Sequence, residues 1–158
     1  MKFNRVAVGG TFDCLHDGHI AILAKAFEIG ERVVIGIVSD EMELRKDSAG
    51  IGSIEVRMRS LLELLRLKGW IERAEITIIS DPFGPAVSDV ALQAIVASPE
   101  TRARAEELNK IRTSNGLPVL EIVEIPFVLA EDGVPISSVR VLYKEIDTHG
   151  KLLKRYTE

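Results

Sequence analysis

Short runs of apolar, often β-branched residues alternate along the chain with longer segments in which apolar residues recur every three or four positions. Residues 32–38, with the sequence RVVIGIV, are almost entirely apolar, which is the pattern of a strand covered on both faces of a sheet. Similar runs predict further strands at residues 3–8, 75–79, 92–97 and 119–124. The pattern therefore predicts five strands.

The segments that follow the runs at residues 3–8 and 32–38 each predict a helix. One helix follows from the helical spacing of four apolar residues before Gly30, which supplies a stop; these are Ile20, Leu23, Ala24 and Phe27. The next helix is expected to begin after Ser53 and to end near Gly69. Its apolar face comprises Met58, Leu61, Leu62 and Leu65.

Two more helices are expected in the second half of the chain. Ser98, Pro99 and Glu100 predict a helix start, because serine caps the first turn, proline suits the first helical position and the helix dipole stabilises an acid there. This helix is expected to end at residues 115–116. The last helix is expected to begin around Ser138 and to carry Val139, Leu142 and Ile146.

Strands that alternate with helices are typical of βαβ units, in which right-handed crossovers place helices on both faces of a parallel sheet. The predicted fold class is therefore α/β, with a doubly wound parallel sheet of five strands. Residues 125–135 contain two prolines and a Glu-Asp-Gly turn, and are expected to form a loop. Residues 1–158 are interpreted as one domain, with a charged tail at 151–158 that is expected to fray.

Composition narrows the class of protein. The 158 residues are 46% hydrophobic and 28% charged, which excludes disorder caused by low hydrophobicity and high net charge. A net charge of −4 disfavours general binding to nucleic acid or to an anionic membrane. No apolar run approaches the roughly 20 residues that span a bilayer. Cys14 is the single cysteine, so no intrachain disulfide can form, as suits a cytoplasmic protein.

The turn after the first predicted strand carries the candidate chemistry. Gly9 and Gly10 allow the backbone to approach a bulky anion, and Gly18 stands where a helix begins, so free amides and the helix dipole favour phosphate. His16 and His19 are three residues apart and are expected to point to the same side of a helical turn. Two imidazoles above an anion site indicate a function in phosphate chemistry.

This turn also has simpler interpretations. A histidine can merely cap a helix or pack against it, although two histidines that flank a glycine favour a functional site. Cys14, His16 and His19 are residue types that bind metals. Zinc sites generally need three or four ligands, however, and the remaining His149 lies in the tail. No metal site built from protein side chains is therefore expected.

Two motifs resemble those of a known superfamily. Residues 9–19 contain the HxGH signature of the nucleotidyltransferases, as His16-Asp17-Gly18-His19. Residues 136–140, with the sequence ISSVR, resemble the ISSxR motif of the same superfamily. The two motifs lie more than a hundred residues apart in the expected order, with strands and helices predicted between them.

The middle of the chain resembles one family within this superfamily. Residues 81–85 (DPFGP) and 97–101 (ASPET) are similar to segments of phosphopantetheine adenylyltransferases of the archaeal and eukaryotic type. The resemblance covers roughly residues 6–140. Phe83 replaces the usual tyrosine of that family, and Val139 replaces a common threonine.

The resemblance implies a Rossmann-like fold and a reaction that transfers AMP from ATP to 4′-phosphopantetheine. The products are dephospho-coenzyme A, an intermediate of coenzyme A biosynthesis, and pyrophosphate. The acceptor phosphate is already an anion, so catalysis needs positioning and charge neutralisation rather than a general base. ATP is then a substrate, and Mg²⁺ is expected to arrive with it. The residues that the resemblance assigns to catalysis are His19, His16 and Lys46.

The resemblance also assigns binding residues. ATP is expected to contact Gly9, Gly10, Thr11, His16, Gly18, His19, Ser137, Ser138 and Arg140. The acceptor side is expected to include Thr11, Lys46, Arg57 and Asp81. The adenosine side is expected to include Glu100, Thr101, Arg102 and Asn109.

Several of these side chains have a second interpretation. Arg57 is equally consistent with an ordinary exposed helix face, and Asp81 with a turn before Pro82. The basic residues of the third predicted helix are interpreted as a solvated face, because acidic residues interrupt them; they are Arg102, Arg104, Lys110 and Arg112.

Other functions stay open. A cytidylyltransferase acting on glycerol 3-phosphate or phosphocholine, a nicotinamide-mononucleotide adenylyltransferase and an FAD synthetase share the HxGH turn. A nucleotide-binding domain without catalysis is an alternative from another class. The expected partners are small-molecule substrates, with neither nucleic acid nor membrane, and the chain is expected to be a monomer or a weak homo-oligomer.

Overall fold

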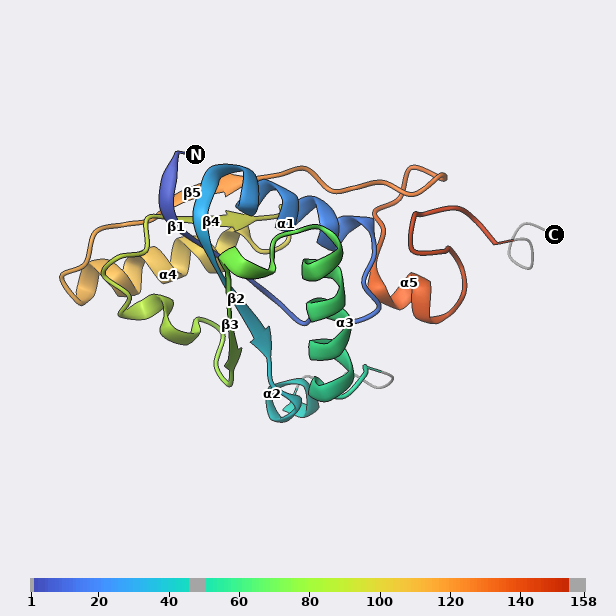
Figure 1. Ribbon diagram of the computed structural model, residues 1–158, viewed down its shortest axis with the longest axis horizontal. Helices are drawn as coiled ribbons and strands as arrows, with labels where there is room; N and C mark the ends of the chain where they lie inside the picture. Colours follow the sequence, from blue (N-terminus) through green and yellow to red (C-terminus); the bar gives the residue numbers. More distant parts are fainter. Residues whose placement is uncertain (1, 46–50, 154–158) are drawn as a thin grey trace.

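The computed structural model describes residues 2–45 and 51–153, and Figure 1 shows its elements. The strands are β1 (Phe3–Gly10), β2 (Gly30–Val38), β3 (Ala74–Ile79), β4 (Ala94–Ala97) and β5 (Glu121–Glu124). The helices are α1 (Asp17–Ile29), α2 (Asp40–Arg45), α3 (Ile54–Leu67), α4 (Arg102–Ser114) and α5 (Ser138–Leu142). Two short 3₁₀ turns are η1 (Ile71–Arg73) and η2 (Gly84–Val87).

The five strands form one parallel sheet in the order β3-β2-β1-β4-β5, which confirms the predicted fold class. β1 lies at the centre, where Val6 pairs with Val33 of β2 on one side and with Ala94 of β4 on the other. The direction in which strands are added reverses between β1 and β4. Open α/β sheets bind ligands at such a switch point, beyond the carboxyl ends of the strands.

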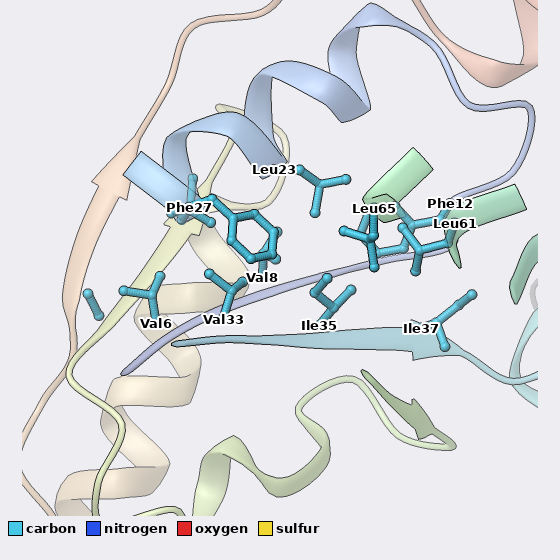
Figure 2. Close-up of a cluster of buried hydrophobic side chains, with 13 residues drawn as sticks. Val6, Val8, Phe12, Leu23, Phe27, Val33, Ile35, Ile37, Leu61 and Leu65 are labelled. Atoms are coloured by element: carbon cyan, nitrogen blue, oxygen red, sulfur yellow. The ribbon is translucent and has the colours of Figure 1, made fainter. Parts of the chain in front are cut away.

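The alternation of side chains along the strands builds a core on each face of the sheet. On one face, Val6 and Val8 of β1 pack with Val33 and Ile35 of β2 against α1 and α3. Figure 2 shows the helix side chains that cover this layer, which are Leu23 and Phe27 of α1 and Leu61 and Leu65 of α3. On the other face, the smaller Ala7 and Val34 contact a cluster that includes Leu108 of α4.

Most helix limits follow the sequence pattern, but the start of α4 does not. Ser53 caps α3 as expected, with its hydroxyl accepting from the amide of Val56 at 3.3 Å. Ser98 was expected to cap the next helix, and that prediction is wrong. The hydroxyl of Thr101 accepts from the Ser98 amide at 3.0 Å, so residues 98–101 form a separate turn and α4 begins at Arg102.

The second half of the chain also differs in detail. The last helix is shorter than expected, because α5 ends at Leu142 and Ile146 instead pairs with Leu152 in a buried bridge. Of the tail that was expected to fray, Leu152 forms this bridge and residues 154–158 lie outside the described part. The helix α2 was not predicted, while residues 125–135 form a loop with a single bridge between Leu129 and Pro135.

A buried arginine joins the strand ends to the helices around them. Arg57 of α3 is only 1% exposed, so its interpretation as an exposed helix face is wrong. Its guanidinium donates to the carbonyl oxygens of Thr11 (2.9 Å), Val38 (2.7 Å) and Gly52 (2.7 Å). It also pairs with Asp40 at 3.0 Å. Carbonyl groups beyond the ends of β1 and β2 need partners, and this side chain supplies them.

The same carboxylate links α2 to α3. Oδ1 of Asp40 accepts from the amide of Ile54 at 2.7 Å as well as from Arg57. The end of β2, the start of α2 and the start of α3 are therefore held in one hydrogen-bonded cluster around the guanidinium.

We predict that replacing Arg57 with leucine destabilises the fold strongly. The Arg57→Leu substitution leaves three carbonyl groups without their donor and Asp40 without its cation. Each buried carbonyl group left without a donor typically costs about 1–3 kcal/mol, whereas the Asp40 side chain is 47% exposed and can be hydrated when its cation is removed. Urea unfolding followed by circular dichroism measures the free energy of unfolding. The matched control is Arg59→Leu, at an exposed position of the same helix, and an equal loss in both variants contradicts the prediction.

Candidate active site

The two histidines of the HxGH motif cap α1 reciprocally. Nδ1 of His16 accepts from the backbone amide of Gly18 at 3.0 Å, and Nδ1 of His19 accepts from the backbone amide of His16 at 3.1 Å. The arrangement is that of a capping box, with imidazole nitrogens in place of the usual hydroxyl and carboxylate. The two ring centroids lie 3.9 Å apart. The start of the helix therefore determines the orientation of both rings.

These hydrogen bonds determine the protonation state of the rings. A nitrogen that accepts from an amide carries no proton, so each neutral ring bears its proton on Nε2. Burial lowers the pKa of His19 to about 3, and the neighbouring His16 adds to this effect. Burial also lowers the pKa of His16, against an opposing effect of Asp17. Both rings are thus neutral hydrogen-bond donors at physiological pH.

The backbone before the histidines is strained. Phe12 and Cys14 have φ angles of 54° and 44°, in the left-handed region that side chains other than glycine rarely adopt. Contacts from distant parts of the chain hold this turn. The hydroxyl of Ser138 donates to the carbonyl of Asp13 at 2.6 Å, and the carboxylate of Asp13 accepts from the amide of Gly52 at 3.0 Å. Strain of this kind persists only where the surroundings stabilise it.

The C-terminal part of the described chain also contacts this turn. The amide of Asp17 donates to the carbonyl oxygen of Thr148 at 2.9 Å, and the Asp17 carboxylate lies 2.9 Å from Nδ1 of His149. This carboxylate raises the pKa of His149. The residue between the two catalytic candidates of the motif is therefore tied to a segment more than 130 positions away.

A cavity of about 610 Å³ opens beside the turn, at the switch point between β1 and β4. It extends along the face of the sheet that carries Ala7 and Val34, toward α4. The cavity brings together ten of the predicted site residues, namely Gly9, Gly10, Thr11, His16, Gly18, His19, Glu100, Thr101, Ser137 and Ser138. This is the largest group of predicted residues that the structure gathers in one place.

Five of the predicted site residues that the structure describes do not line this cavity. Asp81 closes a turn, since Oδ1 accepts from the amides of Phe83 (2.9 Å) and Gly84 (2.7 Å). Asn109 exchanges two hydrogen bonds with the backbone of Leu120. Arg102 forms ion pairs on the surface, with Glu106 at 3.0 Å and Glu124 at 3.6 Å.

Arg140 is the fourth. Its guanidinium pairs with Asp132 and Glu145 and donates to the carbonyl oxygens of Val134 and Pro135. Ser137, the first serine of the motif, caps α5 because its hydroxyl accepts from the amide of Arg140 at 3.3 Å. The ISSVR motif thus places its serines at the cavity and its arginine in a cluster of protein partners.

Arg57 is the fifth of these residues: it is buried outside the cavity, and its guanidinium donates to the carbonyl oxygens of Thr11 and Val38, which both line the cavity. Lys46 lies outside the described residues.

Sequence reasoning missed two arginines of α4. Arg104 lines the cavity, although it was assigned to a solvated face. Arg112 is 0% exposed and donates to the carbonyl oxygens of Pro118, Ala86 and Asp89, so its assignment to that face is wrong. A signal for Arg104 exists in the sequence, since Thr101, Arg104 and Leu108 follow helical spacing on the face that meets the sheet.

The thiol of Cys14 is close to the turn but does not line the cavity. Burial raises its pKa, and the neighbouring Asp13 raises it further, so the thiolate needed for nucleophilic attack is disfavoured. Across residues 2–45 and 51–153, no three His, Cys, Asp or Glu side chains gather as a metal site. In the same residues, no helix combines the length and apolar character of a membrane span.

Known proteins resemble this chain over most of its length. A family model described as cytidylyltransferase-like matches residues 7–143. The phosphopantetheine adenylyltransferase of Methanothermobacter thermautotrophicus is 46% identical over 98% of this chain and 92% of its own. That of Pyrococcus abyssi is 42% identical over 98% of this chain and 99% of its own.

Solved structures agree with the fold. A protein of unknown function from Archaeoglobus fulgidus superposes with a TM-score of 0.69 at 32% identity, over 77% of this chain and 88% of its own. Tyrosyl-tRNA synthetase from the same organism has a TM-score of 0.68 at 13% identity, over 89% of this chain and 60% of its own. At that identity, the second similarity concerns the fold alone. The family match and the extent of the curated similarity together establish that this chain belongs to the phosphopantetheine adenylyltransferases, within the cytidylyltransferase-like family.

Proposed function

We propose that this protein transfers AMP from ATP to 4′-phosphopantetheine, giving dephospho-coenzyme A and pyrophosphate. The observation that carries the proposal is the pair of neutral imidazoles at the cavity, each with Nε2–H free of the cap, in a chain of this family. Two hydrogen-bond donors held at the start of a helix suit an α-phosphate on which charge develops.

His19 and His16 stabilise the five-coordinate phosphorus by donating from Nε2. Neither ring takes or gives a proton, because the attacking group is a phosphate oxygen that is already ionised. The rings need no rearrangement on binding, since backbone amides already hold both Nδ1 atoms. Catalysis in this proposal comes from positioned donors and aligned substrates.

The Gly9–Gly10 backbone and Thr11 hold the acceptor phosphate or the α-phosphate. Arg57 supports this function without touching substrate, because it binds the Thr11 carbonyl and so determines the path of the chain after β1. Lys46, which follows α2, completes the acceptor side in this proposal, as the resemblance implies.

Ser137 and Ser138 line the cavity, and in this proposal they bind the outer phosphates of ATP together with Arg140. Arg140 can reach them only by exchanging Asp132 and Glu145 for phosphate oxygens. Glu100 and Thr101 are assigned to the adenosine side, since both line the cavity. Asp81, Arg102 and Asn109 are not assigned to substrate binding, because their side chains form hydrogen bonds or ion pairs with other residues of the protein.

Mg²⁺ enters this proposal as part of the ATP substrate. Two of the three carboxylates that line the cavity are already engaged, because Asp13 accepts from Gly52 and Asp89 pairs with Arg5. Such a lining fits an ion held mainly by phosphate oxygens, which would neutralise charge on the leaving pyrophosphate. The proposal also includes a cytoplasmic location and a monomer or weak homo-oligomer that acts on small molecules.

A pyrophosphate-release assay tests the proposed reaction. ATP and CTP are each combined with phosphopantetheine, nicotinamide mononucleotide, FMN, glycerol 3-phosphate and phosphocholine. We expect release only from ATP with phosphopantetheine. Release with another pair identifies a different transferase of the superfamily, and no release with any pair favours a binding domain without catalysis.

His19 should contribute mainly to the transition state. We predict that His19→Ala lowers kcat by about 100- to 1,000-fold, the usual effect of losing one donor to developing charge. The matched variant is His19→Asn, whose side-chain oxygen can accept from the His16 amide but which lacks a donor at the position of Nε2. Both variants should bind ATP nearly as well as the original protein in calorimetry. A kcat that stays unchanged in His19→Asn removes the catalytic assignment.

For Arg140, the prediction concerns which nucleotide is affected. Arg140→Ala should weaken binding of ATP by about tenfold, a factor that corresponds to 1.4 kcal/mol, and should leave AMP binding unchanged. Arg140→Lys, which keeps the charge, should lose less. Because Arg140 also anchors the loop around Asp132, a urea midpoint checks that each variant is folded. Equal losses for ATP and AMP mean that Arg140 does not hold the outer phosphates.

A further inference from the structure

Three arginines of α4 have different surroundings. Arg102 is neutralised on the surface by Glu106 and Glu124, and Arg112 is buried among backbone carbonyl groups. Arg104 is exposed, and no residue in the described part of the chain forms an ion pair or hydrogen bond with its guanidinium. Its charge is therefore available to a ligand.

The position of Arg104 on the helix directs it to the cavity. Thr101, Arg104, Ala105 and Leu108 are spaced by three, one and three residues, which places them on one face of α4. All four line the cavity. Leu108 is 2% exposed, whereas Arg104 is exposed, so this face leads from the interior of the cavity to its opening.

The charges of the cavity make this side chain important. Among the described residues that line it, Arg104 is the only lysine or arginine, whereas Asp13, Asp89 and Glu100 are carboxylates. The two histidines carry no charge in this state. Both substrates of the proposed function are phosphorylated, so the cavity has to accept several negative charges with little positive charge of its own.

We propose that Arg104 binds a phosphate group of a substrate in this cavity. The inference rests on the proposed function, because it takes the two phosphorylated ligands from it. The planar guanidinium can donate two parallel hydrogen bonds to a phosphate, which an isolated ammonium cannot do with the same geometry. The phosphate is either the triphosphate of ATP or the monoester of phosphopantetheine, and the experiment distinguishes these sources.

Calorimetric titration of Arg104→Ala tests the proposal. The ligands are ATP and phosphopantetheine, with adenosine and pantetheine as the matching compounds without phosphate. We expect about tenfold weaker binding of one phosphorylated ligand, with no change for its unphosphorylated counterpart. Arg104→Lys should recover part of the affinity, and the difference should shrink at high salt because an exposed charge is screened. The control is Lys110→Ala, which removes an exposed charge from the same helix outside the cavity.

Each result of these titrations either supports the proposal or contradicts it. Weaker ATP binding assigns Arg104 to the triphosphate, and weaker phosphopantetheine binding assigns it to the acceptor. Unchanged affinity for both ligands, or an equal loss for the compounds without phosphate, overturns the proposal. If neither phosphorylated ligand binds even the unmodified protein, the proposal also fails. A protein that binds both ligands but releases no pyrophosphate contradicts the proposed reaction instead, and the Arg104 result then stands on the binding data.

Discussion

The site depends on the hydrogen bonds and the ion pair that the buried guanidinium of Arg57 forms. A buried cation is tolerated only when hydrogen bonds and an opposite charge replace its hydration. Here the carbonyl oxygens of Thr11, Val38 and Gly52 do so together with Asp40, and they come from the segments where β1 and β2 end and where α2 and α3 begin. The contacts that neutralise the charge of Arg57 thus also hold the ends of β1 and β2 at the start of α3. Hydrogen bonds to the carbonyl groups of Thr11 and Asp13, from Arg57 and Ser138, stabilise the strained backbone at Phe12 and Cys14.

The two histidines that cap α1 are neutral, in contrast to the positively charged guanidinium of Arg57. Both rings give their Nδ1 atoms to the backbone and remain neutral, so the end of the helix presents donors rather than a full positive charge. The cavity beside them carries carboxylates and a single described cation. Aligned dipoles and a few placed charges suit the phosphate groups of the proposed substrates, and they are compatible with the weakly acidic composition of the whole chain.

Local patterns were sufficient for much of the fold and for the central turn. Five apolar runs gave the parallel sheet, and the spacing of glycines and histidines identified the cavity wall. The buried polar residues could not be predicted in this way. Arg57 and Arg112 have the same chemistry as exposed arginines, and only distant carbonyl groups distinguish them. Ser98 failed as a cap because its hydroxyl lies against the hydroxyl of Thr101, at 3.4 Å, and Thr101 itself occupies the N-cap position of α4.

The contacts of the histidine turn also have a consequence for the order in which it is completed. Two of its hydrogen bonds are made with Ser138 and Thr148, which are synthesised more than 120 residues after the turn itself. Chains emerge from their N-terminus at about 5–20 residues per second. In a nascent chain, the residues of β1 and α1 are therefore present for several seconds before Ser138 can donate to the carbonyl of Asp13 and Thr148 can accept from the amide of Asp17. The histidine turn therefore acquires its full set of hydrogen bonds only after residues 138–148 have been synthesised.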